Sequence, residues 1–222
     1  RAIAHHIQRS SKDNLRDAIF DGLRQVSGAY SLLFLTPDFL VAVKDPQGVR
    51  PLCLGEKEGA VVVSSESSAF DIVDGEFVRS LHPGEAAIID DDGVKYLRPF
   101  EEEQVSPCVF ELIYFSRPDS TVFGEQVYAM RRQSGEILAE ESHVDSDVVI
   151  PVPDSGVPAA LGYSEQTGVP YELGLIRSHY IGRTFIEPEA AVRNLRIRLK
   201  LSPMKELLRG KRVVVVDDSI VR

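Results

Sequence analysis

Cysteine and long apolar runs are scarce in this sequence. Its 222 residues include two cysteines, too few for a disulfide framework, and nothing at the start is typical of a secretory signal. We therefore expect reduced thiols and a cytoplasmic protein. No apolar run approaches the roughly 20 residues that a membrane-spanning helix needs, so we expect no membrane-embedded part.

Positive charge is also scarce over most of the chain. Lysine and arginine number 25 against 34 aspartates and glutamates, which gives a net charge of −9 and argues against a protein that coats nucleic acid. Residues 176–212 are the exception, with 10 basic and 3 acidic residues. A basic segment in an acidic chain is a candidate anion site, although a solvated helix face with acidic partners elsewhere has the same composition.

The first half of the chain has the pattern of a helix followed by antiparallel strands. Apolar residues recur at helical spacing over residues 11–26. Short turns at Thr36–Asp38 and Asp91–Gly93 join strand-like runs into two hairpins. We predict an α+β layered domain over residues 1–105 that ends in an acidic linker. Its predicted strands are residues 29–35, 39–43, 60–65, 76–81, 85–90 and 94–100.

After residue 106, short apolar runs alternate with helical segments. The apolar runs are residues 147–153, 169–176 and 212–218, and residues 127–141 repeat apolar residues at helical spacing. This alternation predicts βαβ units and a parallel, Rossmann-like α/β sheet over residues 106–222. In such sheets ligands bind beyond the carboxyl ends of the strands. We therefore expect the loops after the first and third runs to share a site.

Two adjacent carboxylates at the mouth of the last run are the strongest chemical signal. Asp217 and Asp218 follow four consecutive valines, with Ser219 behind them. In the loop both carboxylates can face a ligand, one holding hydroxyl groups and the other a magnesium shell. Alternatively, Asp218 or Ser219 caps a following helix. The apolar residues on both sides make this motif more specific than the bare triplet.

Two further loops are candidates for anion binding. Ser155 and Gly156 follow the run at 147–153, where small residues let backbone amides approach a phosphate. The second loop, YIGRTFI at residues 180–186, lies in the basic segment. It is either an ordinary surface loop or a lid over an anionic substrate.

Taken together, these residues resemble the amidophosphoribosyltransferases, also called glutamine phosphoribosylpyrophosphate amidotransferases. The resemblance runs from about Ile3 to Arg222. In the second half it rests on CVFELIYFSRPDS, VIPVPDSG, YIGRTFIEP, LKL and VVVVDDSIVR, of which DDSIVR with IGRTFI is specific to this enzyme among phosphoribosyltransferases. In the first half, GAYSLLFL, KDPQGVRPL, SSESSAFD and PGEA are similar to the later part of the family's glutaminase domain.

The resemblance implies a partial N-terminal nucleophile glutaminase domain of type 2 over residues 1–105, followed by a partial type I phosphoribosyltransferase domain over residues 106–222. It also implies an enzyme that releases ammonia from glutamine and passes it to phosphoribosyl pyrophosphate. The products are 5-phosphoribosylamine, pyrophosphate and glutamate, in the first committed step of de novo purine biosynthesis. The resemblance also implies feedback inhibition by purine nucleotides and a homo-oligomer. It implies no nucleic-acid or membrane partner.

The same resemblance assigns roles to single residues. Asp217 and Asp218 would hold the ribose hydroxyls and the magnesium–substrate complex, and Ser155 is a further magnesium position. Metal and cationic groups beside the leaving pyrophosphate lower the activation barrier of the transfer, because they neutralise the charge of the pyrophosphate while the ribose C1 becomes oxocarbenium-like. The implied substrate-binding residues are Asp217, Asp218, Ser219, Tyr180 and Arg183, and the loop of Arg183 would close over the site.

The cysteines depart from the family pattern. The family's catalytic cysteine is the first residue of the mature protein, whereas no cysteine precedes Cys53 here, and Cys53 has the context of a buried strand residue. Cys108 stands where cluster-containing members carry an iron–sulfur ligand, so the resemblance implies a [4Fe–4S] cluster. Such a cluster needs four thiolates, and a buried cysteine is the alternative. We expect a fragment that is inactive on glutamine and binds phosphoribosyl pyrophosphate weakly, with magnesium.

Two other functions fit parts of the sequence. A non-catalytic regulator with a phosphoribosyltransferase fold would bind phosphoribosyl pyrophosphate and DNA, but residues 1–105 are acidic and strand-rich instead of basic. A sugar-phosphate aminotransferase would share only the glutaminase domain, and the VVVVDDSIV run argues against it.

Overall fold

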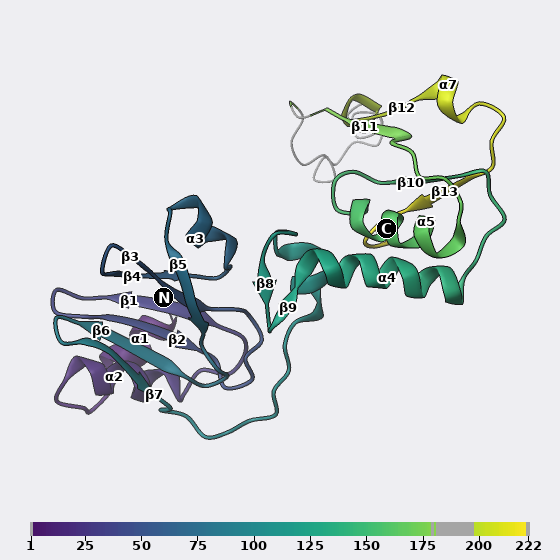
Figure 1. The fold of residues 1–222 in the computed structure, drawn as a ribbon. Coiled ribbons are helices and arrows are strands. Elements are labelled where there is room, and N and C mark those ends of the chain that lie inside the picture. Colours follow the sequence, from purple (N-terminus) through teal and green to yellow (C-terminus); the bar gives the residue numbers. More distant parts are fainter. Residues whose placement is uncertain (1, 179, 181–197, 221–222) are drawn as a thin grey trace. The chain divides into compact units, whose positions relative to one another are not determined.

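The structure of the chain is a computed structural model that describes residues 2–178, 180 and 198–220 (Figure 1). The chain divides into two compact units, Arg1–Glu125 and Gln126–Arg222, and each is described by itself. Of the helices in the described residues, none is long and apolar enough to cross a membrane.

Two helices open the first unit, α1 (Ala2–Gln8) and α2 (Leu15–Leu23). The side chain of Asn14 caps α2 by accepting a hydrogen bond of 2.9 Å from the Asp17 backbone N–H. The two helices cross closely at Gly22, where a Cβ would lie 2.7 Å from the Ile7 nitrogen. The helix predicted over residues 11–26 is therefore confirmed as α2, with a shorter length.

A four-stranded antiparallel sheet follows, in the order β1-β2-β6-β7. Both predicted hairpins are confirmed, because Leu35 pairs with Leu40 and Asp90 pairs with Gly93. The Thr36 hydroxyl stabilises the first turn by donating to the Phe39 carbonyl at 2.8 Å. The strands are β1 (Ser31–Leu35), β2 (Leu40–Lys44), β6 (Ala86–Asp90) and β7 (Gly93–Leu97).

A second antiparallel sheet has the order β4-β3-β5, with the short helix α3 (Ser68–Ile72) between β4 and β5 along the chain. At Gly55 in β3 the neighbouring strand β5 approaches so closely that a Cβ would lie 2.5 Å from the Glu76 carbonyl oxygen. The strands are β3 (Cys53–Lys57), β4 (Ala60–Ser64) and β5 (Glu76–Ser80).

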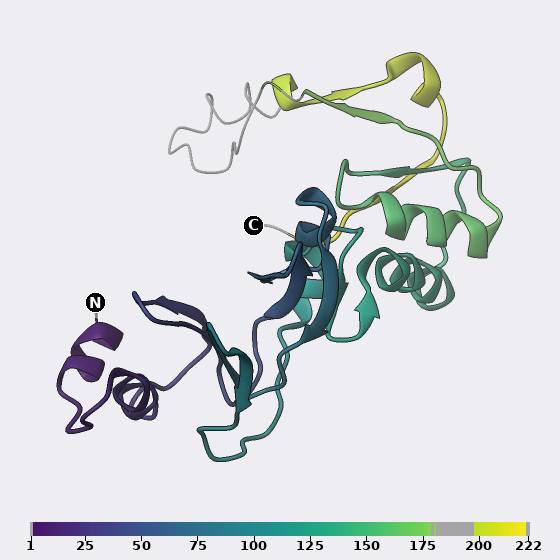
Figure 2. The same cartoon turned by 60° about the vertical axis from the view of Figure 1, so that its left-hand side comes forward.

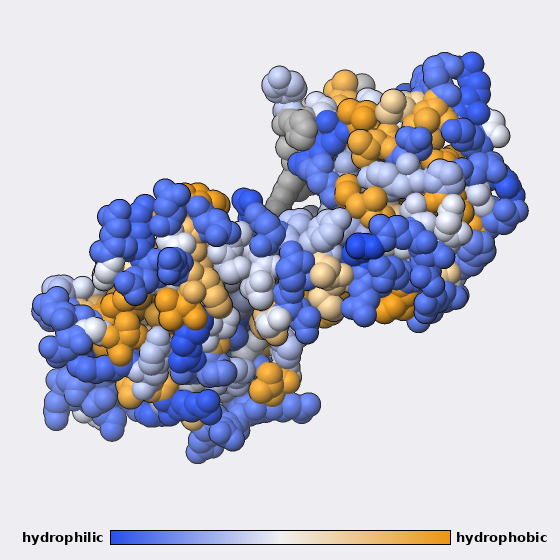
Figure 3. Space-filling model, in the orientation of Figure 1, coloured by the Kyte–Doolittle hydropathy of each residue, from blue (hydrophilic) through white to orange (hydrophobic). Residues whose placement is uncertain are grey.

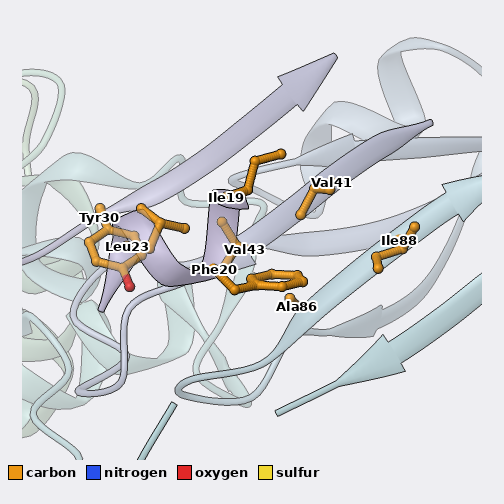
Figure 4. Close-up of a cluster of buried hydrophobic side chains, with 8 residues drawn as sticks. All are labelled: Ile19, Phe20, Leu23, Tyr30, Val41, Val43, Ala86 and Ile88. Carbon is orange, nitrogen blue, oxygen red and sulfur yellow. The ribbon is translucent and has the colours of Figure 1, made fainter. Parts of the chain in front are cut away.

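Alternation along the central strands builds a three-layer core. Val41, Val43 and Ile88 pack against α1 and α2 on one face of the four-stranded sheet (Figure 4). Ala42 and Ala87 point to the opposite face and meet apolar residues of the second sheet. Figure 2 shows the layers in order: the two helices, the four-stranded sheet, and the three-stranded sheet. The predicted α+β layering of the first half is confirmed.

The segment after residue 105 packs on the first unit. The Ser106 N–H donates to the Gln47 carbonyl at 2.8 Å, and the Cys108 N–H donates to the Val49 carbonyl at 3.0 Å. The buried Glu111 forms an ion pair with Arg50. The elements here are the π-helix η1 (Glu111–Phe115) and the hairpin of β8 (Thr121–Val122) and β9 (Glu125–Gln126). The first compact unit thus extends to Glu125, while the functional boundary after residue 105 stays a prediction.

Two helices that cross at glycines form the body of the second unit. They are α4 (Val127–Glu141), which confirms the helix predicted there, and α5 (Val157–Thr167). A Cβ at Gly135 would overlap the Ala159 carbonyl, and one at Gly162 would overlap the Arg132 carbonyl. Glycine at both positions therefore allows the two backbones to touch.

The predicted parallel pairing is present in the second unit. Strand β10 (Val148–Pro151) pairs in parallel with β13 (Val213–Val216), in register from start to end. Helix α5 covers one face, where Ala160 and Tyr163 pack on Val149 and Val216. Exposed apolar side chains occur on both units, and Figure 3 shows apolar surface on each.

The predicted strand at residues 169–176 is largely absent from this parallel pair. Only Tyr171 bridges to Val149, after Pro170, which has no N–H to extend a ladder. The last hydrogen bond to β10 runs from the Glu172 N–H to the Val149 carbonyl, and β11 (Leu175–Arg177) then pairs antiparallel with β12 (Leu201–Pro203). The short helix α7 (Lys205–Leu208) follows β12.

Candidate functional site

The two loops predicted to share a site lie at the same edge of the β10–β13 pair. The Val152 N–H donates to the Val216 carbonyl at 2.8 Å, which ties the loop after β10 to the end of β13. Glycine at position 156 lets this loop lie directly against the end of β13, because a Cβ there would lie 2.6 Å from the Val216 oxygen. The structure therefore brings Ser155 and the acidic pair to one edge, as parallel strands require.

The acidic pair follows β13 directly. The Asp218 N–H donates to Asp217 Oδ1 at 2.9 Å, and the Ser219 hydroxyl donates to Asp218 Oδ1 at 2.6 Å. Burial raises the pKa of Asp217 above its ordinary value and the Asp218 charge adds to this, while the hydrogen bond from the Asp218 N–H opposes it. The other oxygen of Asp218, Oδ2, is buried and has no hydrogen-bond partner among the described residues.

The pair has the donor set of a magnesium site. Mg²⁺ prefers oxygen ligands and is usually held by one or two carboxylates together with substrate phosphates. Asp217 and Asp218 offer carboxylate oxygens. The buried Oδ2 of Asp218 accepts no hydrogen bond among the described residues, and a bound cation would supply the missing partner. Within the described residues no group of three or more His, Cys, Asp or Glu gathers at one point. The residues present therefore fit an ion that shares its coordination with a bound substrate.

The loop after β10 is more engaged than the sequence indicates. The N–H groups of Gly156 and Val157 donate to the carbonyls of Val152 and Asp154, at 3.0 and 3.3 Å. These two amides are thus occupied within the turn instead of facing a phosphate. Asp154 forms an ion pair with Arg177 at the end of β11, a contact that sequence reasoning missed because no local pattern relates the two residues.

The basic loop is only partly described. Tyr180 is 100% exposed. Arg183 lies outside the described residues, so its predicted place over the site stays a prediction. Arg177 is the basic side chain that the described residues show bound to the loop after β10.

The two cysteines lie in different surroundings. Cys53 is buried in β3, as predicted, and its thiol donates to the Ser64 carbonyl at 3.2 Å. Burial raises its pKa to about 11, with the nearby Glu66 charge adding to this. Cys108 is half-buried. Two cysteines do not supply the four thiolates of a [4Fe–4S] cluster, so these residues alone do not fit that group.

The fold and the site define a mixed α/β protein with antiparallel sheets in its first unit and a carboxylate-bearing loop after a parallel strand in its second. Comparison with known proteins narrows this class. The chain is 55% identical to amidophosphoribosyltransferase 1, chloroplastic, of Arabidopsis thaliana over 208 residues, which is 92% of this chain and 36% of that protein. It is 48% identical to the amidophosphoribosyltransferase of Bacillus subtilis over 220 residues, 99% of this chain and 46% of that protein.

A solved structure agrees. Glutamine phosphoribosylpyrophosphate amidotransferase from B. subtilis, complexed with ADP and GMP, superimposes with a TM-score of 0.91 at 48% identity, over 99% of this chain and 48% of that one. No family model matches the sequence. The chain is therefore a homologue of the amidophosphoribosyltransferases, and it spans less than half the length of the curated relatives it matches.

Proposed function

We propose that this protein acts as an amidophosphoribosyltransferase, which uses glutamine to aminate phosphoribosyl pyrophosphate in purine biosynthesis. The observation that carries the proposal is the acidic pair Asp217–Asp218 at the carboxyl end of β13, at the same sheet edge as the loop of Ser155, in a chain 48% identical to the B. subtilis enzyme. In open parallel sheets this edge is where ligands bind.

The two halves of the reaction are proposed to belong to two domains. Helices layered on two antiparallel sheets support a glutaminase domain of the N-terminal nucleophile type over residues 1–105. The parallel β10–β13 pair covered by α5 supports a type I phosphoribosyltransferase domain over residues 106–222.

The acidic pair would orient the ribose of the substrate. Carboxylates accept hydrogen bonds from hydroxyl groups, so Asp217 and Asp218 can fix the two ribose hydroxyls and hold C1 toward the incoming ammonia. The C1–nitrogen bond then forms as the C1–oxygen bond to pyrophosphate breaks. Magnesium bound by the pair, with Ser155 nearby, would neutralise the departing pyrophosphate. Ser219, Tyr180 and Arg183 are proposed to bind the substrate.

The glutaminase nucleophile is assigned to neither cysteine of this sequence. Nucleophilic catalysis needs an accessible thiolate beside a base. Cys53 is 4% exposed, and its pKa of about 11 keeps the thiol protonated at neutral pH.

The remaining partners are proposals of the same kind. The B. subtilis relative was solved with ADP and GMP, which supports purine nucleotides as regulators here. A homo-oligomer and a cluster with Cys108 among its ligands rest on the resemblance alone. The proposed cytoplasmic location rests on the low cysteine content. The two Arabidopsis relatives, by contrast, are named as chloroplastic.

A binding experiment tests the acidic pair. We expect calorimetric titration of the chain with phosphoribosyl pyrophosphate to show magnesium-dependent binding that Asp217→Asn weakens roughly ten- to a hundredfold, the equivalent of about 1.5–3 kcal/mol for a hydrogen bond to a charged group. Asn keeps the shape of the side chain and removes its charge. Asp91→Asn, at an exposed turn of the first unit, is the matched control and should bind as the wild type does. Equal affinities of wild type and Asp217→Asn would refute the role.

A further inference from the structure

Lys44, the last residue of β2, is a lysine buried in the first unit. Only 4% of its surface is exposed. The one hydrogen bond that the described residues give its ammonium group is a long one, 3.4 Å to the Leu81 carbonyl oxygen. The ammonium also lies 5.3 Å from the centroid of the Phe123 ring. An ammonium group has three N–H donors, so the donors of Lys44 are not all satisfied by these contacts.

The buried carboxylates near Lys44 are engaged by other groups. Asp45 accepts hydrogen bonds from the backbone N–H groups of Tyr30 and Val49, each at 3.2 Å. Glu85 forms an ion pair with Arg79 and accepts the His82 N–H at 2.8 Å. Among the described residues, no carboxylate lies within ion-pair distance of Lys44. Its positive charge is therefore buried without a direct counter-ion.

A cavity of about 600 Å³ lies beside this lysine, inside the first unit. Both partners of the ammonium, Leu81 and Phe123, are in its wall. Most of the remaining wall is apolar, and it includes Leu52, Phe77, Val78 and Pro107. The volume is within the range of about 300–1,000 Å³ found for pockets that hold small molecules.

We propose that this cavity binds a small organic carboxylate, with its apolar body against Leu52, Phe77 and Phe123 and its carboxylate on the Lys44 ammonium. A buried charge without a partner is costly, and an anion that pairs with it removes that cost. The apolar wall selects for a ligand with an apolar body instead of an inorganic anion. Burial lowers the pKa of Lys44, the charge of Asp45 opposing this, which is the expected signature of an ammonium that lacks a close anion.

This site is independent of the proposed enzyme activity. It lies wholly within residues 44–124, whereas the acidic pair is in the second unit. Failure of carboxylate binding would leave the phosphoribosyl pyrophosphate experiment untouched, and the reverse holds as well.

Benzoate is a suitable probe because it joins a carboxylate to a rigid apolar body. We expect calorimetric titration of the chain to show benzoate binding, and no binding of benzamide, which has nearly the same shape without the charge. Lys44→Met keeps the apolar stem and removes the ammonium, and should weaken benzoate at least tenfold. Lys12→Met, at an exposed lysine with no side-chain partner among the described residues, is the matched control and should bind benzoate as the wild type does.

A second measurement keeps the test decisive if Lys44→Met does not fold. In wild-type protein labelled with ¹³C-lysine, benzoate should raise the titration midpoint of the Lys44 side chain, while benzamide should leave it unchanged. Absence of benzoate binding to the wild type, equal binding of benzoate and benzamide, or an unmoved Lys44 titration would each overturn the proposal.

Discussion

Single residues decide how closely the elements of the second unit approach. Gly135 and Gly162 lie where α4 and α5 touch, and a Cβ at either position would overlap backbone of the opposite helix. The sequence places Gly135 inside the helical pattern of residues 127–141 and Gly162 in a segment of small residues, and a glycine inside a helix usually lowers its stability. The reason for these two glycines, the close contact between the helix backbones, can be identified only when the partner helix is known.

Gly162→Ala is expected to destabilise the second unit. The added methyl meets the Arg132 carbonyl, which belongs to backbone and cannot rotate away. Overpacking of this kind costs about 1–3 kcal/mol, which outweighs the better helix propensity of alanine. Urea unfolding followed by circular dichroism measures the change. Gln133→Ala, at an exposed position of α4, is the control and should shift the midpoint little.

A second effect at this scale depends on pH. Arg212 binds the Asp147 carboxylate through its side chain and its backbone N–H, at 2.8 Å each, and so lowers the pKa of Asp147 to about 2. A carboxylate with a lowered folded-state pKa stabilises the fold above its unfolded value of about 3.9, and this contribution is lost as the pH falls toward about 2.

Asp147→Asn should therefore lower the stability at neutral pH and flatten its fall between about pH 4 and pH 2 by the same amount, which is small because the pair is exposed. Urea midpoints recorded across this range measure the effect. Asp13→Asn, an exposed aspartate without an ion pair among the described residues, should leave the profile unchanged. Parallel profiles for wild type and Asp147→Asn would contradict the assignment.

Elements were predictable where the pattern is local. The turns at Thr36–Asp38 and Asp91–Gly93 indicated both hairpins, and the valine run indicated a strand that pairs in parallel. Contacts between residues far apart in the sequence were not predictable. No local pattern relates β3 to β5, whose register shifts after Leu54, and none relates Arg50 to Glu111. The same division holds at the site. The parallel-strand rule brought the two loops together, but the ion pair of Asp154 with Arg177 depends on where β11 runs.

Strand β13 also allows a prediction about association. In the described residues it pairs only with β10, and Val215 in its centre is 54% exposed. An apolar strand with an open edge favours edge-to-edge pairing between molecules. We expect concentration-dependent self-association in sedimentation velocity, reduced by Val215→Lys because the charge is costly to bury between strands. Val144→Lys, at a loop residue 51% exposed, should not reduce it, and an equal effect of both substitutions would argue against β13 as the contact.

For the molecule as a whole, charge and thiol chemistry separate the two proposed half-reactions. Acidic residues dominate the chain up to residue 175, and the basic residues gather in 176–212, in the unit where an anionic substrate is proposed to bind. The first unit, by contrast, offers Cys53 and Cys108 as its thiols. Glutamine hydrolysis requires one of these to act as a thiolate if the 222 residues are to perform it by themselves.

We expect the 222-residue chain to release no glutamate from glutamine above a protein-free control. Cys53 is buried at the start of β3 and has a pKa of about 11, so its thiolate is scarce at neutral pH, and no base is hydrogen-bonded to its sulfur among the described residues. Alkylation by iodoacetamide, read by peptide mass spectrometry, should label the half-buried Cys108 well before Cys53. Glutamate release that Cys53→Ser or Cys108→Ser abolishes would show that one of these thiols is a nucleophile after all, and would identify which.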